Sequence, residues 1–198
     1  MAGFKNSEVR IAGTGNVWVA PAGTAAPKET TALATPWVNL GFTSSDGVKF
    51  NKKDKNDPVD TWQSMAPARF MLSDRDLTVK FQLLQMNKDT FPFYLGLAST
   101  SIVTAGSTAE TTAQKIDITG APGGQDQRAL AIDFADNNGT KDLRYRLVIP
   151  NGAVSEVEEL SLTRTGAVKL GITFTALSGD TPTNPLATWL VNDPAALA

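Results

Sequence analysis

The stretch ALAIDFADNNGTKDLRYRLVI, residues 129–149, contains two runs rich in β-forming residues, separated by an Asn-Gly pair. Asn-Gly readily adopts the positive φ angles of a tight hairpin turn. The stretch therefore predicts a β-hairpin between Ala129–Phe134 and Leu143–Ile149. An antiparallel, mainly β protein is the fold class that this hairpin indicates.

Alternating apolar and polar residues predict more strands on both sides of this hairpin. Between Asp76 and Leu84, Leu, Val and Phe alternate with Thr, Lys and Gln, which is typical of a strand with one buried and one polar face. Val154–Leu162 and Val168–Leu177 predict a second hairpin that turns at Thr165-Gly166. Shorter strands are expected at residues 16–21, 37–42 and 47–51.

One segment, residues 87–97, predicts a short helix instead. It combines a capping-type start, clustered aromatic residues and a Gly where a helix would stop. Pro92 is tolerated only in the first turn, so we expect about two turns, packed on the sheet by Phe91, Tyr94 and Leu95.

The strands and the helix define one domain, residues 15–177, which we expect to be an antiparallel β-sandwich or partial barrel. Three stretches lack any period: an N-terminal arm at residues 1–14, a long loop at 52–69 and a C-terminal arm at 178–198. A long loop inside a compact domain is more often functional than idle.

Composition excludes several classes of function. The 198 residues include no Cys and no His, which removes disulfides, thiolate metal sites, the Ser–His–Asp triad and the Cys–His dyad. We therefore expect no enzyme, no cofactor and no metal site. The formal net charge of −2 argues against a dedicated nucleic-acid binder. The sequence shows no signal peptide and no apolar run of membrane-spanning length, which predicts a soluble protein made in a cytoplasm.

The loop at 52–69 carries mixed charges and then Trp62 and Met65, with Phe70 directly after it. An ordinary solvated loop is one interpretation. Apolar side chains on an extended arm without a core of its own are more typical of a protein–protein interface. The candidate interface residues are Asp54, Lys55, Asp57, Asp60, Trp62 and Met65.

Glu156, Glu158 and Glu159 raise the question of a paired-carboxylate site for sugar hydrolysis. Glu156 and Glu158 fall on one face of a predicted strand beside solvent-type residues. A wet sheet face is therefore the better interpretation, and no catalytic residue is expected.

Several segments, taken in order and spacing, resemble the major tail tube proteins of bacteriophages with long, non-contractile tails, particularly those of actinobacteria. The resemblance covers most of residues 15–177. It rests on residues 15–24 with Pro27, 37–42, 45–48, the loop that holds Trp62, the strand at 77–84, the short helix and the final strand at 171–177.

The resemblance implies a β-sandwich with one helix that forms hexameric rings, and these rings stack into a tube through which viral double-stranded DNA passes without specific binding. The loop at 52–69 would reach the neighbouring ring, the terminal arms would brace adjacent subunits, and Glu156 and Glu158 would face an acidic lumen. Implied partners are a tape-measure protein, a tail terminator and tail-tip or baseplate proteins. The implied location is the virion tail, assembled in the bacterial host cytoplasm.

Other functions stay open at this point. The nearest are another phage ring protein, from the neck or the tail end, and the tube protein of a phage-derived particle. A carbohydrate-binding or adhesin β-sandwich would carry aromatics on one exposed strand face, whereas the Trp residues at 18, 37, 62 and 189 lie on separate segments. An enzyme is the most distant alternative.

Overall fold

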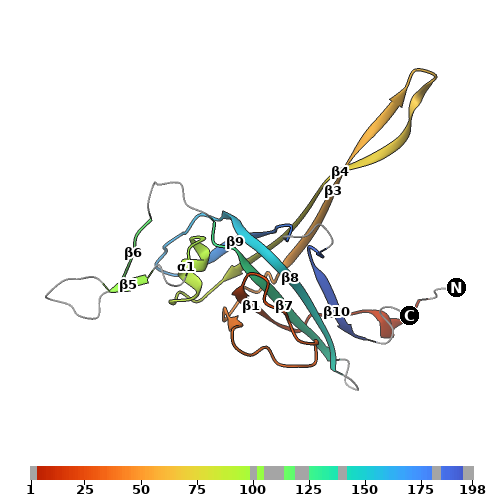
Figure 1. The fold of residues 1–198 in the computed structure, drawn as a ribbon. Coiled ribbons are helices and arrows are strands. Elements are labelled where there is room, and N and C mark those ends of the chain that lie inside the picture. The colour runs from red at the N-terminus through yellow and green to blue at the C-terminus, as the bar shows by residue number, and fades with distance from the viewer. Residues whose placement is uncertain are drawn as a thin grey trace.

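The computed structural model describes residues 4–98, 102–104, 114–118, 125–137, 142–179 and 184–193. Within these residues, eight strands form one antiparallel sheet that does not close on itself (Figure 1). The sheet order is β2 (Val38–Asn39), β1 (Thr14–Pro21), β7 (Arg128–Asn137), β8 (Asp142–Val157), β9 (Leu170–Ala176), β4 (Ser64–Leu83) and β3 (Lys49–Thr61), with β10 (Thr188–Asn192) paired to β8. The expected fold class, mainly β and antiparallel with one short helix, is confirmed.

Strand β8 connects two halves of the sheet, one that contains β1 and β7 and one that contains β9, β4 and β3. Along one edge it pairs with β7, and along the other it pairs first with β10 and then, from Gly152 onward, with β9. A Cβ atom at Gly152 would overlap the ring of Phe174 and approach the main-chain oxygen of Thr175 to 2.6 Å. A residue without a side chain therefore permits the close strand contact where β8 passes from one half to the other.

The sheet folds over so that β1, β7 and β8 pack against β4 and β9. The alternating residues predicted for β4 form the core side of that strand, with Val79 and Leu83 fully buried. Their neighbours across the layer come from β1, β7 and β8, and include Val17, Leu130 and Ile149. Burial of this shared apolar surface holds the two halves together.

The helix α1 (Thr90–Tyr94) covers one end of this core, and is shorter than expected. Pro92 lies in its first turn, and the Asn87 side-chain oxygen accepts hydrogen bonds from the main-chain N–H groups of Asp89 and Thr90. Tyr94 is buried and its hydroxyl donates to the main-chain oxygen of Glu158 at 2.6 Å. Phe91 and Leu95 are partly buried against the core, as predicted.

Both predicted hairpins are present with changed details. In the first, Ile132 of β7 lies opposite Leu147 of β8, while its Asn138-Gly139 turn falls outside the described residues. In the second, β8 pairs with β9, but the connection extends over residues 158–169 instead of a turn at Thr165-Gly166. The expected strand at 37–42 shrinks to β2. A separate two-stranded sheet, β5 (Ile102–Thr104) and β6 (Gln114–Ile116), was not predicted.

The prediction of a loop at 52–69 is wrong. These residues form the outer part of a long β3–β4 hairpin that projects from the body (Figure 1). The register begins with Lys49 opposite Lys80 at the base and ends with Thr61 opposite Ser64 beside the turn, with irregularities after Lys55 and after Val59. Main-chain pairing that starts at the buried base thus propagates through a sequence without alternation.

The terminal segments are not simple arms. Residues 188–192, inside the expected C-terminal arm, form β10 and extend the sheet beside β8. The N-terminal segment contains a short 3-10 helix, η1 (Asn6–Glu8), before β1. Residues 1–3, 180–183 and 194–198 lie outside the described part of the chain.

Candidate assembly surfaces

The β3–β4 hairpin presents its side chains to solvent along its outer length. From Lys55 to Asp76 every residue is exposed or half-buried. A two-stranded hairpin alone in water is marginally stable, because it has no third strand or helix to cover a face. Its outer half therefore lacks a packing partner among the described residues of the chain.

Ion pairs connect the two strands at the base of the hairpin. The Arg75 guanidinium donates to both Asp54 carboxylate oxygens, at 2.8 and 3.1 Å, and Lys52 Nζ lies 2.6 Å from the same carboxylate. The hydrogen bonds from Arg75, followed by that from Lys52, lower the pKa of Asp54 from 3.8 to about 2. Lys55 and Asp57 form a looser pair at 3.7 Å. Asp54, Lys55 and Asp57 thus interact within the hairpin.

The outer half of the hairpin carries an unusual amount of exposed apolar surface. Trp62 in the turn is 98% exposed and Met65 just beyond it is fully exposed. We call this group the apolar tip; it consists of Val59, Trp62, Met65, Phe70, Met71 and Leu72. The sequence analysis did not predict Met71 and Leu72 as interface residues, because they fall between the expected loop and the expected strand. Exposed apolar surface of this kind is typical of an interaction site.

The outward side of four neighbouring strands, β3, β4, β9 and β8, forms a second surface that we call the polar face. The register places its members side by side, opposite in direction to the buried core residues. They are Lys49, Asn51, Thr78, Lys80, Gln82, Ser155, Glu156, Glu158, Thr173 and Thr175. Glu158 reaches across Gly171 and accepts a hydrogen bond from Gln82 at 2.6 Å.

Glu156 and Glu158 therefore share one face, as the sequence pattern indicated. Glu156 lies opposite Thr173, which in turn lies opposite Lys80. The two glutamates are accompanied by Lys49 and Lys80, so the charges of the polar face balance.

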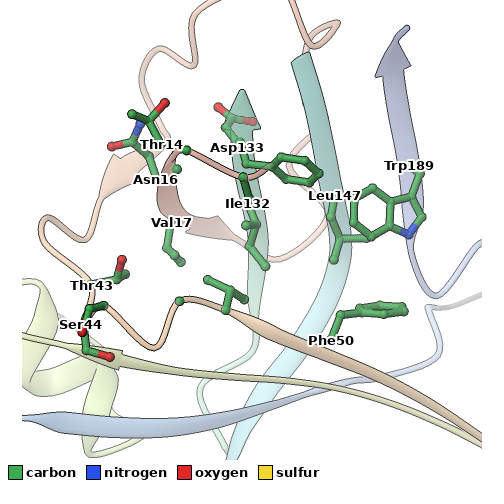
Figure 2. Close-up of a pocket in the computed structure, with 17 residues that line it drawn as sticks. Thr14, Asn16, Val17, Thr43, Ser44, Phe50, Ile132, Asp133, Leu147 and Trp189 are labelled. Carbon is green, nitrogen blue, oxygen red and sulfur yellow. The ribbon is translucent and has the colours of Figure 1, made fainter. Parts of the chain in front are cut away.

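A cleft of about 350 Å³ opens beside the start of the hairpin, between the layer of β1, β7, β8 and β10 and the segment from Thr43 to Phe50 (Figure 2). Val17 and Leu147 are almost fully buried in its wall. Phe50 and Trp189 are 39% and 45% exposed at its rim, and their rings meet edge to face at 5.8 Å. We call this hollow the base cleft.

Hydrogen bonds and an ion pair connect a segment near the start of the described chain to its last described residue. Arg10 Nε lies 2.6 Å from Asp193 Oδ2, and the Tyr145 hydroxyl donates to the same oxygen at 2.6 Å. Burial, followed by the hydrogen bond to Asp193, raises the pKa of Tyr145 above its ordinary value. This cluster holds the segment before β1 against the end of β10.

In the part of the chain that the structure describes, acidic side chains do not gather in groups of three or more that could hold a metal ion. Of the helices described, none is long and apolar enough to cross a membrane.

A family model for phage tail tube proteins matches residues 2–198. The chain belongs to the phage tail tube protein family. No curated protein matches it. Tail tube proteins are structural components of the phage virion tail that self-assemble, so the expectation that the chain is not an enzyme is confirmed.

In this tail tube protein the six predicted interface residues share the hairpin but not one patch. Trp62 and Met65 lie at the outer end, Asp60 lies just before the turn, and Asp54 lies near the base in its ion pairs. The base cleft was missed entirely, because Phe50 and Trp189 are far apart in sequence and meet only when β10 joins the sheet.

Proposed function

We propose that this tail tube protein assembles as hexameric rings that stack into the tube of a long, non-contractile phage tail, through which DNA is delivered. The observation that carries the proposal is the β3–β4 hairpin, which projects from the body and bears an apolar tip without a core of its own. Contact with the next ring would bury that tip. Rings joined by such contacts form an open-ended stack.

The lumen, in this proposal, is lined by the polar face. Four strands per subunit carry it, so six subunits contribute about 24 strands to a shared inner barrel. At about 4.8 Å between strands and a tilt near 40°, the backbone circle is roughly 48 Å across. Side chains reduce the bore to roughly 40 Å, which admits a DNA duplex.

A conduit must not retain the DNA that it conducts. Each phosphate contact made by a Lys or Arg adds salt-dependent affinity. On the polar face Lys49 and Lys80 are offset by Glu156 and Glu158, and the whole chain has a net charge of −2. We infer that Glu156 and Glu158 face the passing DNA and prevent a positive excess along the wall.

The same proposal defines the partners. Copies of the chain are the main partner. A tape-measure protein would occupy the lumen during assembly, and a tail terminator and tail-tip or baseplate proteins would cap the two ends. Assembly would take place in the cytoplasm of the bacterial host, with an actinobacterial host the one that the sequence resemblance favours.

The test is negative-stain electron microscopy of the purified protein at rising concentration. Hollow tubes with six subunits per ring and a bore wide enough for a duplex are the expected result. Single rings that never stack would contradict the tube and favour a neck or tail-end ring. Monomers at every concentration would contradict assembly by this chain alone. In a reconstruction of the tube, Glu156 and Glu158 on the outer surface would overturn the lumen assignment.

A further inference from the structure

We propose that the apolar tip of one subunit docks in the base cleft of a second copy in the neighbouring ring. This inference rests on the proposed stacking of rings and names the two surfaces that form the contact. The occupant of the cleft is the turn of the hairpin, with Trp62 and Met65 as the inserted side chains.

The chemistry of the cleft suits an aromatic side chain. Its wall is apolar, with Val17, Leu147 and Ile132 deep in the hollow. At the rim, Phe50 and Trp189 leave ring surface free for a further aromatic contact. Aromatic rings prefer such offset or edge-to-face arrangements with one another.

The opposite rim of the cleft is polar. Thr43, labelled in Figure 2, carries a side-chain hydroxyl at this rim. A buried indole needs an acceptor for its N–H group. The cleft therefore combines an apolar pocket for the rings with a hydroxyl acceptor for the one polar atom of Trp62.

The apolar tip offers substantial surface for a contact. Its two aromatic and four aliphatic or thioether side chains expose roughly 800 Å² in total, spread over both faces of the hairpin, with Trp62 and Met65 the most exposed. About 800 Å² per partner is the size of a standard specific interface.

Charge does not oppose the contact between copies. Every basic residue of the hairpin from residue 52 to 76 is matched by an acidic one, so the element is neutral. The basic residues are Lys52, Lys53, Lys55, Arg69 and Arg75, and the acidic ones are Asp54, Asp57, Asp60, Asp74 and Asp76.

The positions of the tip and the cleft allow the same contact to repeat from ring to ring. The tip and the cleft lie at opposite ends of one hairpin, so the contact joins unlike surfaces and propagates from ring to ring. From Phe50 to Trp62 the strand spans roughly 40 Å at about 3.3 Å per residue. A tip that docks beside Phe50 of the next copy therefore limits the axial rise to at most roughly 40 Å per ring, because any tilt of the hairpin from the tube axis shortens it.

The test uses disulfide trapping, because the chain has no Cys of its own. The double variant Met65→Cys/Ser45→Cys places one thiol at the tip and one at the exposed rim of the cleft. A disulfide needs Cα atoms within about 7 Å, so these two positions cannot be linked inside one chain. Mild oxidation of the assembled tubes is expected to produce a ladder of covalently linked chains on a non-reducing denaturing gel.

Two controls define the background. Met65→Cys alone can yield at most linked dimers. Met65→Cys/Leu162→Cys moves the second thiol to a residue that is 74% exposed outside the cleft, in the connection between β8 and β9. The cleft pair is expected to link about tenfold more than this control pair. If the reduced Met65→Cys/Ser45→Cys variant does not assemble, Gln63→Cys/Ser45→Cys provides the same test from the turn.

The outcomes separate the two proposals. Tubes in which the cleft pair links no better than the Leu162 pair overturn the docking inference and leave the tube function intact. An axial rise well above roughly 40 Å also contradicts the docking inference, because the hairpin could not span it. Wild-type protein that forms neither rings nor tubes overturns both.

Discussion

Arg146 and Asp133 form a bidentate ion pair across β8 and β7, with Arg146 Nε donating to Oδ1 at 2.6 Å and Nη2 to Oδ2 at 3.1 Å. The Arg146 side chain is only 2% exposed. Its guanidinium also donates to three main-chain oxygens of the segment between β1 and β2, those of Pro27, Lys28 and Thr31. This one side chain therefore connects the segment between β1 and β2 to the sheet.

Arg146→Ala should lower the free energy of unfolding by about 3–5 kcal/mol, because it leaves Asp133 without its partner and three carbonyl groups without a donor. Chemical denaturation of the dilute protein measures the change. Arg164→Ala, at an exposed position in the connection before β9, is the control and should stay within about 0.5 kcal/mol of wild type. A loss below about 1 kcal/mol for Arg146→Ala would show that the cluster contributes little.

Trp62→Ala should leave the monomer as stable as wild type, because the side chain is 98% exposed and contacts no core. It should sharply reduce stacking of rings, seen as fewer and shorter tubes in electron micrographs. Leu162→Ala, which also removes an exposed apolar side chain, should leave the tubes unchanged. Loss of the thermal transition of the monomer in Trp62→Ala would count against an interface role for the tip.

Ile132→Asp, in contrast to Trp62→Ala, should prevent the monomer from folding. Ile132 is 7% exposed in β7 and belongs to the main core, so the substitution would bury a carboxylate without a partner. Circular dichroism of the purified variant should show loss of the cooperative transition. Ile118→Asp, at a position that is 74% exposed, is the matched control and should fold. A folded Ile132→Asp protein would contradict the core described for β7.

The ion pairs at the base of the hairpin predict a pH dependence. The pKa of Asp54 is lowered from 3.8 to about 2, first by the hydrogen bonds from Arg75 and then by that from Lys52. A carboxyl group with a lowered pKa stabilises the folded form above its ordinary pKa, and this contribution is lost as the pH falls from about 4 toward 2. The hairpin base should therefore be held less firmly in strong acid.

Carboxyl ¹³C chemical shifts measured across this pH range test the prediction. The titration midpoint of Asp54 should lie near 2 in the wild-type protein and rise toward 3.8 in Arg75→Gln. Arg69→Gln, on the same hairpin opposite Val59, should leave the midpoint in place. A midpoint near 3.8 in wild type would mean that the pair is open in solution.

Local sequence patterns were enough to predict most of the sheet. The alternation from Leu77 to Leu83 and the runs on either side of Asn138-Gly139 correspond to β4, β7 and β8, because side chains on a half-buried strand must alternate between apolar and polar. The pattern failed for residues 52–69, where both faces of the hairpin meet solvent and nothing selects for alternation. It failed also for β10, whose place depends on the free edge of β8.

Some residues of the candidate surfaces could be predicted from the sequence and others could not. Trp62 and Met65 were predictable, because an apolar residue in a charged segment stands out from its neighbours. Glu156 and Glu158 were placed on one face by the two-residue period of a strand. Phe50 with Trp189, and Arg146 with Asp133, were not predictable, because each pair depends on which strands become neighbours.

The sequence by itself therefore determined the mainly β fold, the buried faces of the strands that alternate, and the presence of exposed apolar side chains on a charged segment. The tertiary structure decided that this segment is a projecting hairpin, that β10 completes the sheet and that a cleft opens at the base of the hairpin. The physical reason is that burial alternates along a single strand, whereas the pairing of strands and the hollows between layers arise only from contacts between residues distant in the chain.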